Sequence, residues 1–114
     1  MKKLIKTQKN FDIYFEMLLV YTPLNEYLPE ETKKDIKKLY SKIERCDLFY
    51  FTAKVTAEIE GLELGSDYLG CCIYENENDF IQDTYFDDMV ENAILDAQSK
   101  LILINKKQIN NLKH

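Results

Sequence analysis

The chain has 114 residues, of which 46% are hydrophobic and 31% are charged. This length and balance are typical of a folded globule, so we expect one domain over residues 1–114. Three cysteines, two of them adjacent, exclude a disulfide framework and favour a reducing compartment. Neither a signal peptide nor an apolar run of membrane-spanning length is visible, so we expect a cytoplasmic protein.

The formal net charge of −5 is unevenly distributed along the chain. Residues 1–45 carry ten basic and seven acidic residues, whereas residues 46–114 carry five basic and thirteen acidic ones. Between Val55 and Ser99 there are twelve carboxylates and no Lys, Arg or His. An acidic surface repels phosphates, which disfavours direct binding of nucleic acid by this part of the chain.

Residues 1–10 are basic and polar, and we expect them to be frayed. The next segment, Phe11–Tyr21, combines two patterns: its first residues alternate as in a strand, and its apolar residues also follow helical spacing. With Asn10 as a candidate N-cap, we predict a helix here and keep a strand as the alternative.

Glu30–Glu44 is predicted to be an amphipathic helix, because apolar side chains recur along it at helical spacing. Pro29 lies just before it, where a fixed φ suits the first turn. Five lysines line the rest of its surface. Glu30 and Glu31 stand close before Lys34 at helical spacing, so we expect local ion pairs to account for most of this charge.

Two strands follow. Along residues 48–60 apolar and polar residues alternate strictly, and residues 68–74 repeat the pattern with Gly70 as a candidate bulge. We expect these strands to pair as an antiparallel hairpin whose loop of six or seven residues contains Gly61 and Gly65.

The last third of the chain is predicted to be an acidic connection over residues 75–82 and a long helix capped by Asp83 or Thr84. Residues 101–104 are apolar on all sides of that helix, so we expect them to be buried or bound. Residues 105–114 are expected to form a loosely held basic tail. The predicted fold is α+β in the order ααββα, or βαββα if the first segment is a strand.

Few residues suggest catalysis or metal binding. The one histidine, His114, ends the sequence, and Cys71 and Cys72 are expected on opposite faces of a strand, where they cannot share a metal ion. Glu75, Glu77 and Asp79 alternate like EF-hand ligands, but the glycine and the final glutamate of that motif are missing. We therefore expect a protein without enzymatic activity or cofactor, with a weak cation site among the aspartates of residues 79–88 as a minor alternative.

The segment from residue 74 to residue 91 is the densest in acids and also carries aromatic side chains. Charge can steer a basic partner to such a surface while aromatic rings supply affinity. The competing interpretation is a solvated face whose acids are favoured by a helix dipole. The candidate partner-binding residues are Tyr74, Glu75, Glu77, Asp79, Asp83, Tyr85, Phe86, Asp87, Asp88 and Glu91.

Residues 67–74 (DYLGCCIY), Asp79-Phe80 and residues 85–91 (YFDDMVE) resemble the hairpin and acidic helix of small phage and mobile-element proteins of the anti-CRISPR and anti-restriction style. The resemblance covers the C-terminal half of the chain. It implies a protein that acts in a host bacterial cell, where its acidic surface mimics nucleic acid and inhibits a host defence protein with a basic surface. The alternative is a small structural or regulatory subunit that forms a homodimer through apolar helix faces.

Overall fold

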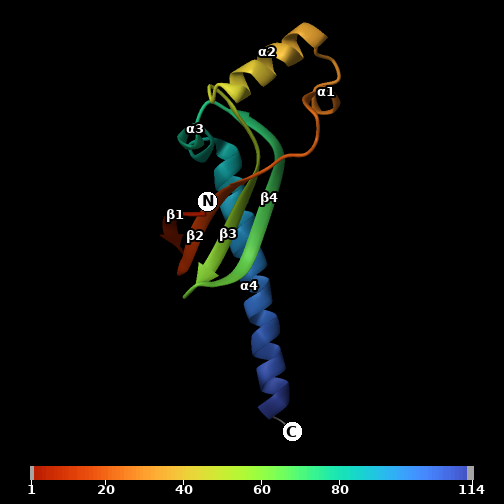
Figure 1. Ribbon diagram of the computed structural model, residues 1–114. Coiled ribbons are helices and arrows are strands. Elements are labelled where there is room, and N and C mark those ends of the chain that lie inside the picture. Colours follow the sequence, from red (N-terminus) through yellow and green to blue (C-terminus); the bar gives the residue numbers. More distant parts are fainter. Residues whose placement is uncertain (1, 113–114) are drawn as a thin grey trace.

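The computed structural model describes residues 2–112, with side chains described as far as Gln108. Figure 1 shows a sheet with a long helix across one face and the shorter helices toward one end. The elements are β1 (Lys3–Gln8), β2 (Phe11–Leu18), α1 (Leu24–Tyr27), α2 (Lys33–Glu44), β3 (Phe49–Ile59), β4 (Leu62–Tyr74), α3 (Glu77–Ile81) and α4 (Thr84–Leu112). The sheet is antiparallel in the order β1-β2-β3-β4. The α+β class is confirmed, but the order is ββααββαα, so the predicted ααββα and its alternative are both wrong.

The helix predicted for Phe11–Tyr21 is wrong, because Phe11–Leu18 is the strand β2. Phe11, Ile13 and Phe15 alternate into the core, so burial favours the strand pattern over helical spacing. Asn10 is not a helix cap. Together with Lys9 it has positive φ, of 68° and 51°, and the two residues form the tight turn between β1 and β2.

The hairpin of β3 and β4 is confirmed, but its predicted loop is wrong. Only Glu60 and Gly61 join the strands, with φ of 50° and 82°, as a two-residue turn with right-handed strand twist requires. Residues 62–67, predicted as loop, belong to β4, whose pairing shifts register near Leu64. A second shift lies between Leu69 and Cys72, next to Gly70, where the sequence predicted a bulge.

The core lies between the sheet and the first half of α4. Val90, Ala93, Ile94 and Ala97 are buried against apolar side chains of β2, β3 and β4. The helix lies very close to β4 at Gly65, where an added Cβ would stand 2.0 Å from the Ala93 carbonyl oxygen. Residue 65 must therefore be glycine for α4 to pack this closely against β4.

A lysine-rich arm made of α1 and α2 lies at the end of the molecule opposite the C-terminus (Figure 1). Thr32 caps α2, since its Oγ1 accepts a hydrogen bond from Asp35 N at 3.2 Å. The helix therefore begins at Lys33, three residues later than predicted, and leaves Glu30 and Glu31 outside it. The expected ion pairs of Glu30 and Glu31 with Lys34 are not among the ion pairs formed by residues 2–112.

Two tyrosine hydroxyls support this arm, one within it and one at its connection to the sheet. Tyr40 Oη accepts a hydrogen bond from Leu24 N at 3.0 Å, which joins α2 to α1. The Tyr50 hydroxyl, on β3, donates to Thr22 O at 2.9 Å and so joins the sheet to the segment that leads into α1. Burial raises the pKa of Tyr50, which keeps this donor protonated.

The second half of α4 extends past the sheet, as Figure 1 shows. The molecule is accordingly elongated, with principal extents of 66 × 25 × 22 Å. Residues 105–112, expected to be a loosely held tail, continue α4, while residues 113–114 lie outside the described residues. How tightly the segment is held is untested and stays a prediction. None of the helices described is long and apolar enough to cross a membrane.

Candidate protein-binding surface

The predicted acidic segment spans three elements: the end of β4, the short helix α3 and the first turns of α4. Asn76 Oδ1 accepts a hydrogen bond from Asp79 N at 2.9 Å and so caps α3, a helix that the sequence analysis missed. Phe80, on α3, is fully buried, and its ring centroid lies 5.4 Å from that of Phe15 and 5.1 Å from that of Tyr74. This aromatic packing anchors the acidic segment to the end of the sheet.

A hydrogen bond fixes the start of α4 to the end of β4. The Tyr74 hydroxyl donates to Asp83 Oδ2 at 2.8 Å. This bond lowers the pKa of Asp83, and burial together with the same bond raises the pKa of Tyr74 to about 12. Tyr74 and Asp83 are therefore bound to each other, and their role is to hold the acidic segment in place.

Phe86 was predicted as a surface anchor, and its position excludes that role. Its side chain is buried in the core, 2% exposed, with its ring centroid 6.0 Å from that of Phe15. Tyr85, the next residue before it, points the other way and is 55% exposed. Of the three predicted aromatic anchors, Tyr85 is thus the one whose ring is free to meet a partner.

The remaining predicted acids lie on the surface: Glu75, Asp79, Asp87, Asp88 and Glu91 are exposed, and Glu77 is half-buried. Within the described residues, the five exposed carboxylates take part in no ion pair. They lie on adjacent elements, since α3 leads directly into α4. The structure therefore brings these predicted residues together in one region.

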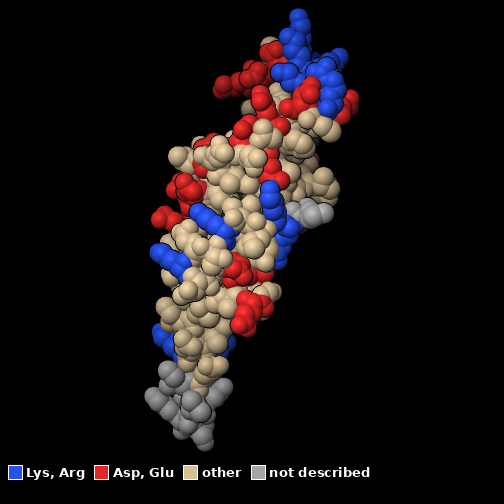
Figure 2. Space-filling model, turned by 90° about the vertical axis from the view of Figure 1, so that its left-hand side faces the viewer, with Lys and Arg blue, Asp and Glu red and all other residues tan. Residues whose placement is uncertain are grey.

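The strand β1, which the sequence analysis treated as a frayed end, brings lysines to this region. Lys3 Nζ lies 3.8 Å from Glu77 Oε1. Lys6 lines a surface hollow of 320 Å³ together with three of the predicted acids, Asp87, Asp88 and Glu91. The face of the molecule shown in Figure 2 likewise carries acidic and basic side chains interspersed with each other. The densest group of basic side chains on it lies at the end formed by α2. The acidic segment is therefore partly neutralised by its neighbours in space.

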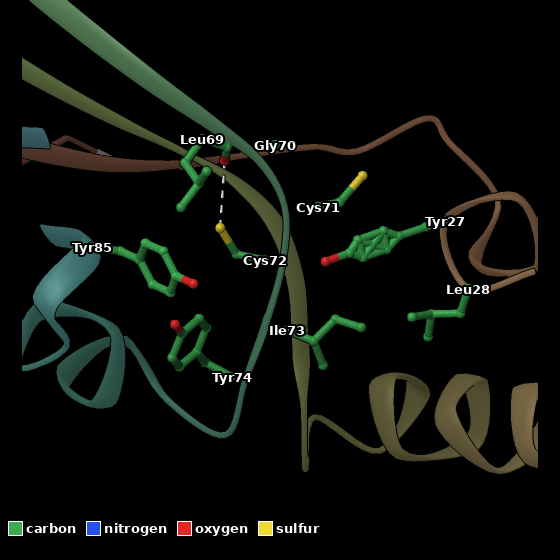
Figure 3. Close-up of a pocket in the computed structure, with 9 residues that line it drawn as sticks. All are labelled: Tyr27, Leu28, Leu69, Gly70, Cys71, Cys72, Ile73, Tyr74 and Tyr85. Carbon is green, nitrogen blue, oxygen red and sulfur yellow. Dashed lines mark hydrogen bonds between the residues drawn. The ribbon is translucent and has the colours of Figure 1, made fainter. Parts of the chain in front are cut away.

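A second hollow, also of 320 Å³, lies next to the acidic segment at the bulge of β4 (Figure 3). Cys71 has a φ of 58° and lies on the same side of β4 as Tyr27, while Cys72 turns to the other side, where its Sγ donates to Leu69 O at 3.4 Å. Tyr85 and Tyr74 stand on that second side. The hollow thus has aromatic walls from α1, β4 and α4, and the contribution of Tyr27 could not be foreseen because it depends on long-range packing.

Side chains suited to metal binding do not converge in the described part of the chain: no three of its His, Cys, Asp or Glu residues could hold an ion together. Comparisons with protein-family models, with curated proteins and with solved structures gave no match. The described surface itself offers exposed carboxylates, the exposed ring of Tyr85 and a shallow aromatic hollow.

Proposed function

We propose that the protein is a non-enzymatic inhibitor that binds the basic, nucleic-acid-binding surface of another protein. The binding surface consists of Glu75, Asp79, Asp87 and Asp88, with Tyr85 as its aromatic anchor. In line with the resemblance to phage anti-defence proteins, the partner is a host defence protein, and the acids occupy the positions that phosphates would take.

The observation that carries the proposal is the exposure of these acids without ion-pair partners in the described residues, on a rigid support. Unpaired like charges on neighbouring turns cost stability. Phe80 and Phe86 fix α3 and α4 in the core, so the carboxylates are held in place before a partner arrives. Preorganised charge of one sign favours fast, salt-sensitive association with a basic surface.

Reversal of the four acids tests the proposal. A variant with Glu75, Asp79, Asp87 and Asp88 changed to Lys should fail to capture, from a bacterial lysate, a nucleic-acid-binding protein that the natural chain captures. Asp83 stays unchanged because its carboxylate supports the fold. A matched control changes four exposed acids outside the acidic segment to Lys, namely Glu30, Glu31, Glu44 and Glu60.

The control variant should capture the same protein as the natural chain, and duplex DNA should displace the protein from both. Capture that survives the reversal of the four acids, or that duplex DNA does not affect, would contradict the proposal. Circular dichroism spectra of both variants should match that of the natural chain, since all eight side chains are exposed.

A further inference from the structure

The outer face of α4 is an apolar surface that no described element covers. Leu95 is 59% exposed and Ile102 is 55% exposed, although both are large aliphatic side chains. They are seven residues apart, which is two helical turns, so they stand on the same face. Ser99 lies between them on this face and is small and exposed. Leu95, Ser99 and Ile102 thus form a stripe along the helix. Two charged residues on the same face extend this stripe, Glu91 before Leu95 and Lys106 after Ile102.

The second half of α4 also lacks support from the sheet. Among the side chains described up to Gln108, Ala97 is the last fully buried one in the helix, and Leu101 is only half-buried. Beyond it, Leu103 and Ile104 are 58% and 41% exposed. A helical segment of this length without tertiary packing is marginal in water. The exposed stripe therefore runs from the packed part of α4 into its unsupported part.

We propose that two copies of the chain form a dimer in which the outer faces of their α4 helices pack against each other, antiparallel, with the two-fold axis between Gln98 and Ser99. This register sets Leu95 of each copy against Ile102 of the other. It also sets Glu91 of each copy against Lys106 of the other. Ser99 lies at the crossing, where a small side chain allows the helices to approach closely.

A second copy is favoured over an unrelated partner because the stripe is complementary to itself. Its first half carries an acid, its second half carries a base, and an aliphatic residue stands at equal distance on each side of the centre. Antiparallel pairing sets opposite charges together and opposes the helix dipoles. A two-fold axis makes each of these contacts twice. No such match arises in a parallel pair, where Glu91 would face Glu91 and Lys106 would face Lys106.

Sedimentation equilibrium over a range of concentrations tests this dimer. The natural chain should show twice its monomer mass of 13.5 kDa at high concentration. Leu95→Asp should raise the dimer dissociation constant at least about tenfold, because it places two carboxylates in an apolar contact. Leu62→Asp is the matched control: Leu62 is 62% exposed at the turn between β3 and β4, and its variant should dimerise like the natural chain.

Charge exchange tests the register itself. Glu91→Lys and Lys106→Glu should each weaken the dimer, and the double variant should restore it, since the pair is re-formed with opposite signs. A natural chain that stays monomeric, or a dimer that tolerates Leu95→Asp, would overturn the proposal. So would a dimer that the double exchange fails to restore. Near-identical circular dichroism spectra of all variants would exclude loss of fold as the cause.

Discussion

At Gly65 the backbone of the sheet lies very close to the backbone of α4. An added Cβ would lie 2.0 Å from Ala93 O and 2.5 Å from Ala97 N. These are backbone atoms of a long helix, so they cannot move aside as a flexible side chain would. The single missing methyl group at Gly65 therefore determines how closely α4 packs over the core.

Gly65→Ala should destabilise the protein by about 1–3 kcal/mol, because α4 must move away from β4 and loosen the core. Urea unfolding followed by circular dichroism measures the effect. Gly70→Ala is the matched control, since an added Cβ there meets no atom within 4 Å. Its stability should stay within about 0.5 kcal/mol of the natural chain. Equal losses in the two variants would contradict the assigned role of Gly65.

The Tyr74–Asp83 hydrogen bond should make stability depend on pH. Because this bond lowers the pKa of Asp83, it contributes stability above the ordinary carboxyl range near about pH 4. The contribution is lost as the pH falls through the lowered pKa of the folded state. Tyr74→Phe should therefore lower the melting temperature at about pH 7 and have a smaller effect at about pH 2. An effect of the same size at both values would show that the bond does not act through the carboxylate.

The strands show what could be read from the sequence and what could not. β3 was predictable because its alternation is strict and supported by β-branched and aromatic residues. The helix prediction for β2 was wrong because Phe11–Leu18 satisfies both patterns, and alternating burial together with pairing to β1 and β3 selects the strand. β1 is mostly polar and adds only the half-buried Ile5 to the core, so its residues show little strand pattern, and its place is set chiefly by pairing with β2.

The candidate site was predictable in composition but not in arrangement. The acids of residues 75–91 could be identified from charge alone, and their exposure could be expected. The burial of Phe86 and the hydrogen bond of Tyr74 depend on contacts between distant elements. The approach of Lys3 and Lys6 depends on β1, which was not foreseen. Local patterns therefore located the surface, and tertiary contacts decided which of its residues are available.

Support for α4 differs along its length, and hydrogen exchange should follow that difference. Residues 89–97 of α4 pack over the sheet, whereas residues 107–112 lie beyond the proposed dimer contact. The amides of residues 107–112 should exchange at least about tenfold faster, because the terminal turns of a helix fray more readily than turns packed on a core. Measurement by NMR in the natural chain also tests the expected loose tail. Equal protection along α4 would contradict both statements.

The whole molecule is extended, and its charge differs between its parts. Its Cα radius of gyration is 18.2 Å, against about 13 Å for a compact domain of this length. The lysine-rich arm of α1 and α2 lies at one end, the acidic segment adjoins the upper part of the sheet, and the free half of α4 forms the other end (Figure 1). This shape offers one surface for the proposed basic partner and, next to it along α4, one for the proposed second copy of the chain.

The salt dependence of partner binding tests the proposed function most directly. The dissociation constant of the captured partner should be measured at about 0.05 M and about 0.5 M salt, for the natural chain and for the variant with Glu75, Asp79, Asp87 and Asp88 changed to Lys. For the natural chain it should rise at least about tenfold with salt, because the contact depends on exposed charges. For the variant, binding should be weak already at low salt. An equal salt dependence and equal affinity in both proteins would contradict an acidic surface that binds a basic partner.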